Sequence, residues 1–423
     1  MNGTGFRKTE LPNGVRVLTE KVPGVRSISI GVWVDQGSRD EPEELSGISH
    51  FIEHMIFKGT KKRSALDIAK AFDRMGGISN AFTSKETICF HAKVMDTHED
   101  EILELLSDIF LNSRFSQEEI ERERLVVLQE ISMVEDTPEE LIHDLFYQFF
   151  WPDHGLGRPV LGSPEIVSQF VSSDISSFVR GRFSPDRVVL ACAGNVDHDQ
   201  FVKKVDYFFG KMEGSTTWPP RTAPVARSGI KVIDKDLEQV NVLIGFEGPS
   251  QRDDSRFDAL LLNVILGGSM SSRLFQEIRE RRGLAYSVYS FHSGYSDSGL
   301  LGMYAGTSPD RAVQVVGLML DELRKLADNP VSDVELQEAK DHVKGGIVLA
   351  SESTDARMNR IARLELVLGR YASIDEVIER IDRVTPESVM KLAQTCLGSK
   401  WATLIMGKVP SGCEDEIRRK FER

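Results

Sequence analysis

The sequence predicts an α+β protein of two homologous α/β domains, which arose by duplication and are joined by a linker. Its 423 residues exceed what one ordinary hydrophobic core serves, so two domains of about 200 residues each are expected. Three prolines among small polar residues give one internal stretch the composition of a linker, and after it the order of strands and helices begins again. We therefore divide the chain into residues 1–212, a linker at 213–229 and residues 230–423.

The first half opens with β-rich segments and continues with helices. Residues 6–36 alternate and turn as a hairpin does, with Leu11-Pro12-Asn13-Gly14 as a turn signal. Residues 47–57 form an apolar run that suits a helix, and glycines at 76 and 77 separate the next helix from a long strand. The further elements expected are strands at 15–18, 27–34, 78–95 and 187–193, and helices at 65–76, 97–112, 116–135, 138–150 and 197–210.

The second half repeats this order. When the halves are overlaid, Gly31 falls on Gly245, and two further glycine pairs (77 with 283, 194 with 407) also match. His50 then becomes Ala259 and Glu53 becomes Leu262, so only the first copy keeps a potential metal site. The elements expected are strands at 230–233, 240–246, 284–291 and 402–406, and helices at 256–281, 309–328, 331–350 and 353–369.

The segment with the clearest chemistry reads His-x-x-Glu-His and comprises His50, Glu53 and His54. On a helix, residues four apart lie one above the other, so both imidazoles point the same way with the glutamate beside them. Two neutral imidazoles suit two corners of a tetrahedral Zn²⁺ site, and the glutamate can take a proton from the activated water. The alternative is an amphipathic core helix whose histidines are held by hydrogen bonds, and packing alone does not separate the two.

A catalytic zinc site needs a third protein ligand. No third histidine is well placed, so a carboxylate is the natural candidate. Glu130 lies in an apolar run that would bury one helix face, where a carboxylate needs a compensating cation. Glu123 lies seven residues earlier on the same face. A solvated helix face explains both glutamates equally well, so spacing alone leaves the ligand open.

Composition limits the partners and the compartment. The net charge of −13 argues against nucleic acid and anionic membrane and is compatible with basic peptides. No apolar run approaches the roughly 18 residues of a membrane span, and the first twenty residues resemble neither a signal nor a transit peptide. We therefore expect a cytoplasmic protein that does not bind membranes. Its cysteines form no C-x-x-C pair, which predicts neither a disulfide framework nor a thiolate metal site.

The chain resembles the insulinase/pitrilysin family of zinc peptidases, and most closely its processing-peptidase branch. The resemblance rests on HFIEH, ERERLVVLQE, GGISNAFTSKET and RERRGLAYSVYS. It implies mixed, mainly antiparallel sheets flanked by helices, one zinc ion per chain on His50, His54 and Glu130, and Glu53 as the general base. It also implies that Glu123 supports the ligands.

The resemblance further implies a substrate-binding edge strand and a second functional pair. The edge strand would comprise Asn80, Ala81, Phe82 and Thr83, and a free strand edge can add an extended peptide through main-chain hydrogen bonds. Arg279 and Tyr286 match a pair that contacts substrate and steadies the oxyanion from the facing half of a closed clamshell.

These features predict a zinc metalloendopeptidase that cleaves peptides or unfolded segments inside a closed chamber. Because one chain carries half a chamber, we expect a homodimer in which Arg279 and Tyr286 of one subunit complete the zinc centre of the other. One alternative is a non-catalytic assembly or binding subunit of the same fold. Another is a structural zinc site, which would call for four closed ligands that usually include cysteine.

Overall fold

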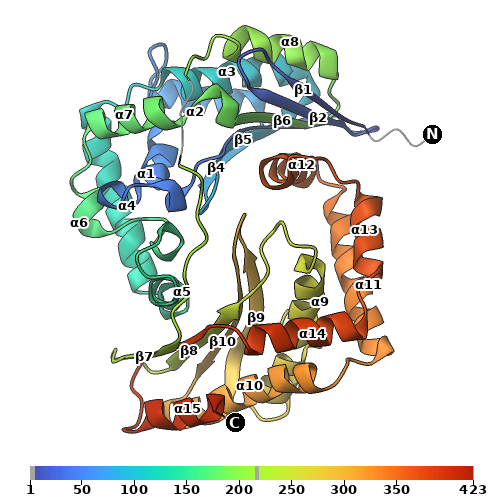
Figure 1. The fold of residues 1–423 in the computed structure, drawn as a ribbon. Helices are drawn as coiled ribbons and strands as arrows, with labels where there is room; N and C mark the ends of the chain where they lie inside the picture. Colours follow the sequence, from blue (N-terminus) through green and yellow to red (C-terminus); the bar gives the residue numbers. More distant parts are fainter. Residues whose placement is uncertain (1–4, 215–218, 423) are drawn as a thin grey trace. The chain divides into compact units, whose positions relative to one another are not determined.

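The computed structural model describes residues 5–214 and 219–422, which form two compact units (Figure 1). Residues 215–218 of the expected linker lie outside the described residues. Unit 1 comprises residues 1–132, 158–220 and 348–373, and unit 2 comprises the remainder. The units therefore do not follow a single cut at the linker, because residues 133–157 belong to unit 2 and residues 348–373 belong to unit 1.

Among the described residues, unit 1 is built on a six-stranded sheet with the order β1-β2-β6-β3-β5-β4. β2 and β6 are parallel and the other neighbours are antiparallel, as expected for a mainly antiparallel sheet. The strands are β1 (Phe6–Glu10), β2 (Arg16–Lys21), β3 (Ser27–Val34), β4 (Ile78–Thr83), β5 (Ile88–Met95) and β6 (Val188–Gly194).

The single strand predicted at residues 78–95 is wrong. It is a hairpin of β4 and β5, because the Ser84 hydroxyl accepts hydrogen bonds from the backbone N–H groups of Glu86 and Thr87 and closes a turn. The helices of unit 1 are α1 (Ile48–Met55), α2 (Ala65–Met75), α3 (Glu99–Asn112), α4 (Gln117–Glu135, whose last turn enters unit 2), α6 (Pro164–Val167), α7 (Ser172–Arg182), α8 (His198–Phe209) and α12 (Thr354–Leu368).

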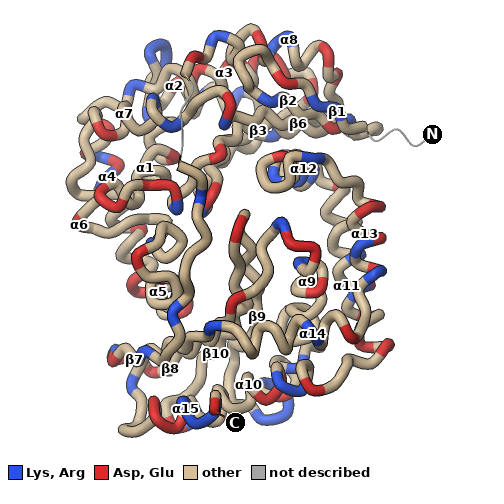
Figure 2. Tube along the Cα trace, in the orientation of Figure 1, with Lys and Arg blue, Asp and Glu red and all other residues tan. Residues whose placement is uncertain are grey.

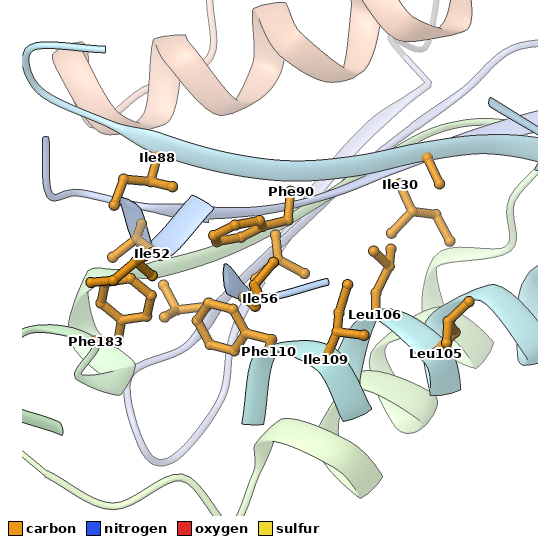
Figure 3. Close-up of a cluster of buried hydrophobic side chains, with 14 of the residues drawn as sticks. Ile30, Ile52, Ile56, Ile88, Phe90, Leu105, Leu106, Ile109, Phe110 and Phe183 are labelled. Atoms are coloured by element: carbon orange, nitrogen blue, oxygen red, sulfur yellow. The ribbon is translucent and has the colours of Figure 1, made fainter. Parts of the chain in front are cut away.

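One face of this sheet forms the main core of unit 1 (Figure 3). Ile30 and Phe90 project from the sheet toward Phe110 of α3 and Ile52 of α1, and all four side chains are buried. The apolar residues of α1 recur at helical spacing and face this core, which leaves the polar side of α1 free to carry the motif.

The opposite face of the sheet is covered by α12, which comes from the second half of the sequence. Met358 of α12 lies directly over Gly31, where an added Cβ would lie only 2.7 Å from the Met358 sulfur. In unit 2, Phe146 lies over Gly245 in the same way, at 2.5 Å from an added Cβ. The two matching glycines therefore make room for a helix on the sheet. The helix over Gly31 in unit 1 comes from the second half of the sequence, and the helix over Gly245 in unit 2 comes from the first half.

Within the described residues, unit 2 has a five-stranded sheet with the order β7-β11-β8-β10-β9, in which β7 and β11 are parallel. This is the order of unit 1 without its first strand, as a duplication predicts. The elements are β7 (Gly229–Ile233), β8 (Val240–Glu247), β9 (Ala285–Gly294), β10 (Gly299–Thr307), β11 (Trp401–Met406), α5 (Pro138–Phe150), α9 (Arg256–Leu266), α10 (Ala312–Asp328), α11 (Asp333–Ala350, whose last residues enter unit 1), α13 (Ile374–Asp382), α14 (Pro386–Leu397) and α15 (Cys413–Phe421).

The helix predicted at residues 256–281 is confirmed over its first part, as α9, but is wrong as one continuous helix. Backbone N–H groups of Gly267 and Gly268 both bond to the carbonyl of Asn263 and end α9, and the segment re-forms as a short π-helix, η6 (Phe275–Glu280). β10 was not predicted, because its run of small and apolar residues contains glycines at 299, 302 and 306.

The charged residues of both signs are interspersed on the outer helices. Figure 2 shows residues of both signs on α13 and on α15, where the acidic residues occupy the first turn and the basic residues the last turn. None of the helices in the described part of the chain is long and apolar enough to cross a membrane. The four cysteines, all among the described residues, are buried and not joined in disulfides.

Candidate metal centre

The helix that carries the motif is fixed at its N-terminus by a buried carboxylate. Glu41 accepts hydrogen bonds of 2.7 Å from the backbone N–H groups of Gly47 and Ser49, which α1 itself leaves unsatisfied. Gly47 adopts a positive φ of 96°, and an added Cβ there would lie 2.6 Å from the Leu161 carbonyl oxygen. These contacts set the start of α1 and thereby the direction of its polar side.

His50, His54 and Glu130 meet on that polar side. Nε2 of each histidine lies 3.5 Å from Oε2 of Glu130, and all three potential ligand atoms lie within 4.8 Å of one another. A tetrahedral zinc ion with bonds near 2.0–2.1 Å holds its ligand atoms about 3.3 Å apart. Two imidazole nitrogens and one carboxylate oxygen at this spacing fit a zinc ion and leave one corner for water.

The electrostatics around the three side chains favour a cation. Burial, and then the neighbouring His54, lower the pKa of His50 to about 3, so its ring is neutral at physiological pH. Burial opposes protonation of His54 as well, but a hydrogen bond to Glu123 and the charges of the nearby carboxylates raise its pKa above the ordinary value. The same ring of carboxylates that attracts a proton to His54 attracts a divalent ion.

The candidate base, Glu53, lies beside the ligands and is held by the end of β4. The Thr83 hydroxyl donates a 2.7 Å hydrogen bond to Oε2 of Glu53. Burial raises the pKa of Glu53, and the hydrogen bond from Thr83 and the proximity of His54 partly oppose this. A carboxylate with a raised pKa is suited to take a proton and later return it.

Glu123 contacts His54, the second histidine of the motif. Its Oε1 lies 2.8 Å from Nδ1 of His54, and its Oε2 lies 2.6 Å from Nζ of Lys58. Burial acts to raise the pKa of Glu123, but the hydrogen bonds with His54 and Lys58 hold it below its ordinary value. A carboxylate that accepts from one ring nitrogen directs the other ring nitrogen toward the metal position.

The predicted substrate strand is β4, which among the described strands pairs only with β5 and so has a free edge. Asn80 is exposed, and its side-chain oxygen accepts from the backbone N–H of Ala81. Phe82 packs edge-on against Trp33. A cavity of about 310 Å³ opens between this strand and α1, lined by Glu53, His54, Phe57, Lys58, Ser79, Asn80, Ala81 and Glu123.

Arg279 and Tyr286 lie in unit 2 and contact each other. The Arg279 guanidinium lies 4.4 Å from the centre of the Tyr286 ring and donates a hydrogen bond to the Tyr286 carbonyl. Tyr286 is 77% exposed, and Arg279 is part of the π-helix, an element often found at functional sites. The pair therefore presents a phenol and a guanidinium that are held together and accessible.

Two contacts of this site were not predicted. Thr83 was predicted as a substrate contact, but its hydroxyl binds the base, and Lys58 was not singled out at all. The position of Lys58, four residues after His54, would place both side chains on one face of a helix. However, α1 ends at Met55, so the sequence pattern does not fix the conformation at Lys58.

A helix that presents two histidines and a glutamate in this order, with a distant glutamate closing the set, has the arrangement of the H-x-x-E-H inverzincin signature. Residues 16–164 match the family model described as Insulinase (Peptidase family M16), and residues 170–343 match the model described as Peptidase M16 inactive domain. The chain therefore belongs to the insulinase family, peptidase family M16.

Similar proteins carry names that agree with this membership. A Bacillus subtilis protein named uncharacterized zinc protease YmxG is 41% identical over 400 residues, which cover 95% of this chain and 97% of that protein. A Streptomyces coelicolor protein named uncharacterized zinc protease SCO5738 is 42% identical, with 95% and 89% covered. The crystal structure of a protease from Helicobacter pylori has the same fold, with a TM-score of 0.90 at 22% identity over 95% of this chain and 99% of that one.

Proposed function

We propose that the protein is a zinc-dependent metalloendopeptidase that cleaves peptides or unfolded segments. The observation that carries this proposal is the convergence of His50, His54 and Glu130 on one position, with Glu53 beside it. The names of the relatives as zinc proteases support zinc as the metal. When bound, a zinc ion supplies Lewis-acid activation of water and of the scissile carbonyl.

The protein's own residues would then move the proton and hold the substrate. Glu53 accepts the proton of the attacking water and delivers it to the leaving amine. The free edge of β4 would add the substrate as an extended strand through main-chain hydrogen bonds, which predicts tolerance of many sequences. The cavity beside Ala81 would receive a substrate side chain.

We further propose that the active form is a homodimer with a closed chamber. In it, Arg279 and Tyr286 of one subunit would donate hydrogen bonds to the oxyanion formed at the zinc centre of the other. The exposure of this preorganised pair supports the proposal.

Mixing two inactive variants tests completion between subunits. After random exchange between Glu53→Gln and Tyr286→Phe subunits, half of the dimers hold one intact site of two, so recovery of about a quarter of wild-type activity is expected. Each variant alone provides the control. Exchange without any recovery would contradict completion between subunits and leave the zinc chemistry untouched.

The peptidase activity is tested with a quenched peptide library and the Glu53→Gln variant. This substitution keeps the size of the side chain and removes the base, so we expect unchanged zinc content and a loss of turnover of about 10²- to 10⁴-fold. Chelator treatment of the wild-type protein should abolish cleavage, and added zinc should restore it. A wild-type protein that binds zinc but cleaves nothing would instead favour a non-catalytic assembly subunit.

A further inference from the structure

The two histidines of the candidate centre are oriented by unequal means. Nδ1 of His50 is buried and has no hydrogen-bond partner among the described residues. Nδ1 of His54 lies 2.8 Å from Oε1 of Glu123. Among the described side chains, a carboxylate therefore contacts the Nδ1 side of the ring only at His54. The direction of the His54 ring then depends on the residue that holds Glu123 in place.

Lys58 is the residue that holds Glu123. The Glu123 side chain is buried, and its second oxygen lies 2.6 Å from Nζ of Lys58. The basic neighbours of Glu123 on α4 do not substitute for Lys58, because Arg122 pairs with Glu118 and Glu119 and Arg124 pairs with Glu121. The two carboxylate oxygens thus have separate partners, one imidazole and one ammonium group.

Both partners come from one short segment of the chain. His54 lies in the last turn of α1, and the backbone N–H of Lys58 bonds to the Met55 carbonyl, which folds the chain back just beyond the helix. A cation at a helix C-terminus is also favoured by the helix dipole. Two residues of the segment 54–58 therefore contact the Glu123 carboxylate, one at each oxygen, and together they restrict its rotation.

We propose that Lys58 is a positioning residue of the metal centre. It holds the Glu123 carboxylate against the Nδ1–H of His54, so that Nε2 of His54 faces the position shared with His50 and Glu130. Lys58 is not a ligand and does not touch the reacting atoms. This proposal rests on the proposed zinc-peptidase function. It adds a residue that affects zinc binding only through Glu123 and His54.

The expected effect is a loss of zinc affinity. Without Lys58, one oxygen of a buried carboxylate lacks its partner, and the carboxylate is free to turn away from His54. Changes to side chains just outside the ligands typically weaken metal binding by about 10- to 100-fold. Because Lys58 lies one contact further out, we expect the lower end, about 10-fold.

The experiment measures zinc dissociation constants of apo-proteins by competition with a chromophoric chelator. Lys58→Met keeps most of the length of the side chain and removes its charge, and it should bind zinc about 10-fold more weakly than wild type. Lys58→Arg restores the cation and should recover most of the affinity. Lys61→Met is the matched control, because Lys61 is exposed, lies three residues further on and loses the same charge.

A double-mutant cycle with Glu123→Gln separates positioning from general destabilisation. If Lys58 acts through Glu123, then adding Lys58→Met to Glu123→Gln should weaken zinc binding little further. An equal loss of zinc affinity in both backgrounds, or wild-type affinity in Lys58→Met, would overturn the proposal. The proposed function would still stand in that case, provided that the wild-type protein binds zinc. Absence of zinc binding in the wild-type protein would overturn both.

Discussion

The contact between the edge strand and the base predicts a specific defect in Thr83→Val. This substitution keeps the shape of the side chain and removes the hydroxyl that donates the 2.7 Å hydrogen bond to Glu53. A hydrogen bond to a charged group contributes about 1.5–3 kcal/mol, and each 1.4 kcal/mol is a factor of ten in rate. We therefore expect kcat/KM to fall by about 10- to 100-fold, with zinc content unchanged.

The pH dependence gives the defect its signature. Burial raises the pKa of Glu53, and the hydrogen bond from Thr83 counteracts that rise. Removal of the hydroxyl raises the pKa further, so that at low pH a smaller share of the base is ready to accept a proton. The deficit in kcat/KM should thus be largest at acidic pH and shrink as the pH increases.

The assay is cleavage of a quenched peptide by Thr83→Val, Thr83→Ser and wild type between about pH 5.5 and pH 9. Thr83→Ser keeps the hydroxyl and should stay close to wild type. If Thr83→Val matches wild type across this range, or if the serine variant is equally impaired, the hydrogen bond does not position the base.

Two further predictions concern stability. Phe146→Ala should lower the free energy of unfolding by about 3–5 kcal/mol in guanidinium titrations, because Phe146 is fully buried over Gly245. The control Val334→Ala, at an exposed position of α11, should change the free energy of unfolding by less than about 0.5 kcal/mol. Similar values for both variants would mean that α5 is not part of the core of unit 2. Removal of zinc by a chelator should lower the melting temperature, and free zinc at 100 times its dissociation constant should raise the free energy of unfolding of the apo-protein by about 2.7 kcal/mol. A melting temperature that responds to neither chelator nor zinc would argue against a resident metal.

The sequence predicted most elements of the fold because hydrophobic periodicity and glycine breaks are local signals. It failed where tertiary contacts decide the structure. Nothing local assigns the predicted helix at 138–150 to unit 2, since the deciding contact is Phe146 on Gly245, about a hundred residues away. The sequence predicts one strand where β4 and β5 form a hairpin, because Ser84-Lys85-Glu86-Thr87 lacks glycine and proline.

For the candidate site, the sequence likewise predicted the part that local spacing determines. The spacing of His50 and His54 is fixed by the helix, so a sequence pattern can find it. Spacing left Glu130 open, and only the resemblance to the insulinase family selected it; the structure brings it to 3.5 Å from both rings. The contacts of Thr83 and Lys58 depend on how β4 and the end of α1 pack, which no local pattern encodes.

The zinc stoichiometry of the wild-type protein and two variants tests the central claim most directly. We predict one zinc ion per chain in the wild-type protein and in Glu53→Gln, and loss of that ion in Glu130→Ala after dialysis against a weak chelator. Full zinc retention by Glu130→Ala, or a wild-type protein that takes up no zinc, would contradict a metal centre formed by His50, His54 and Glu130.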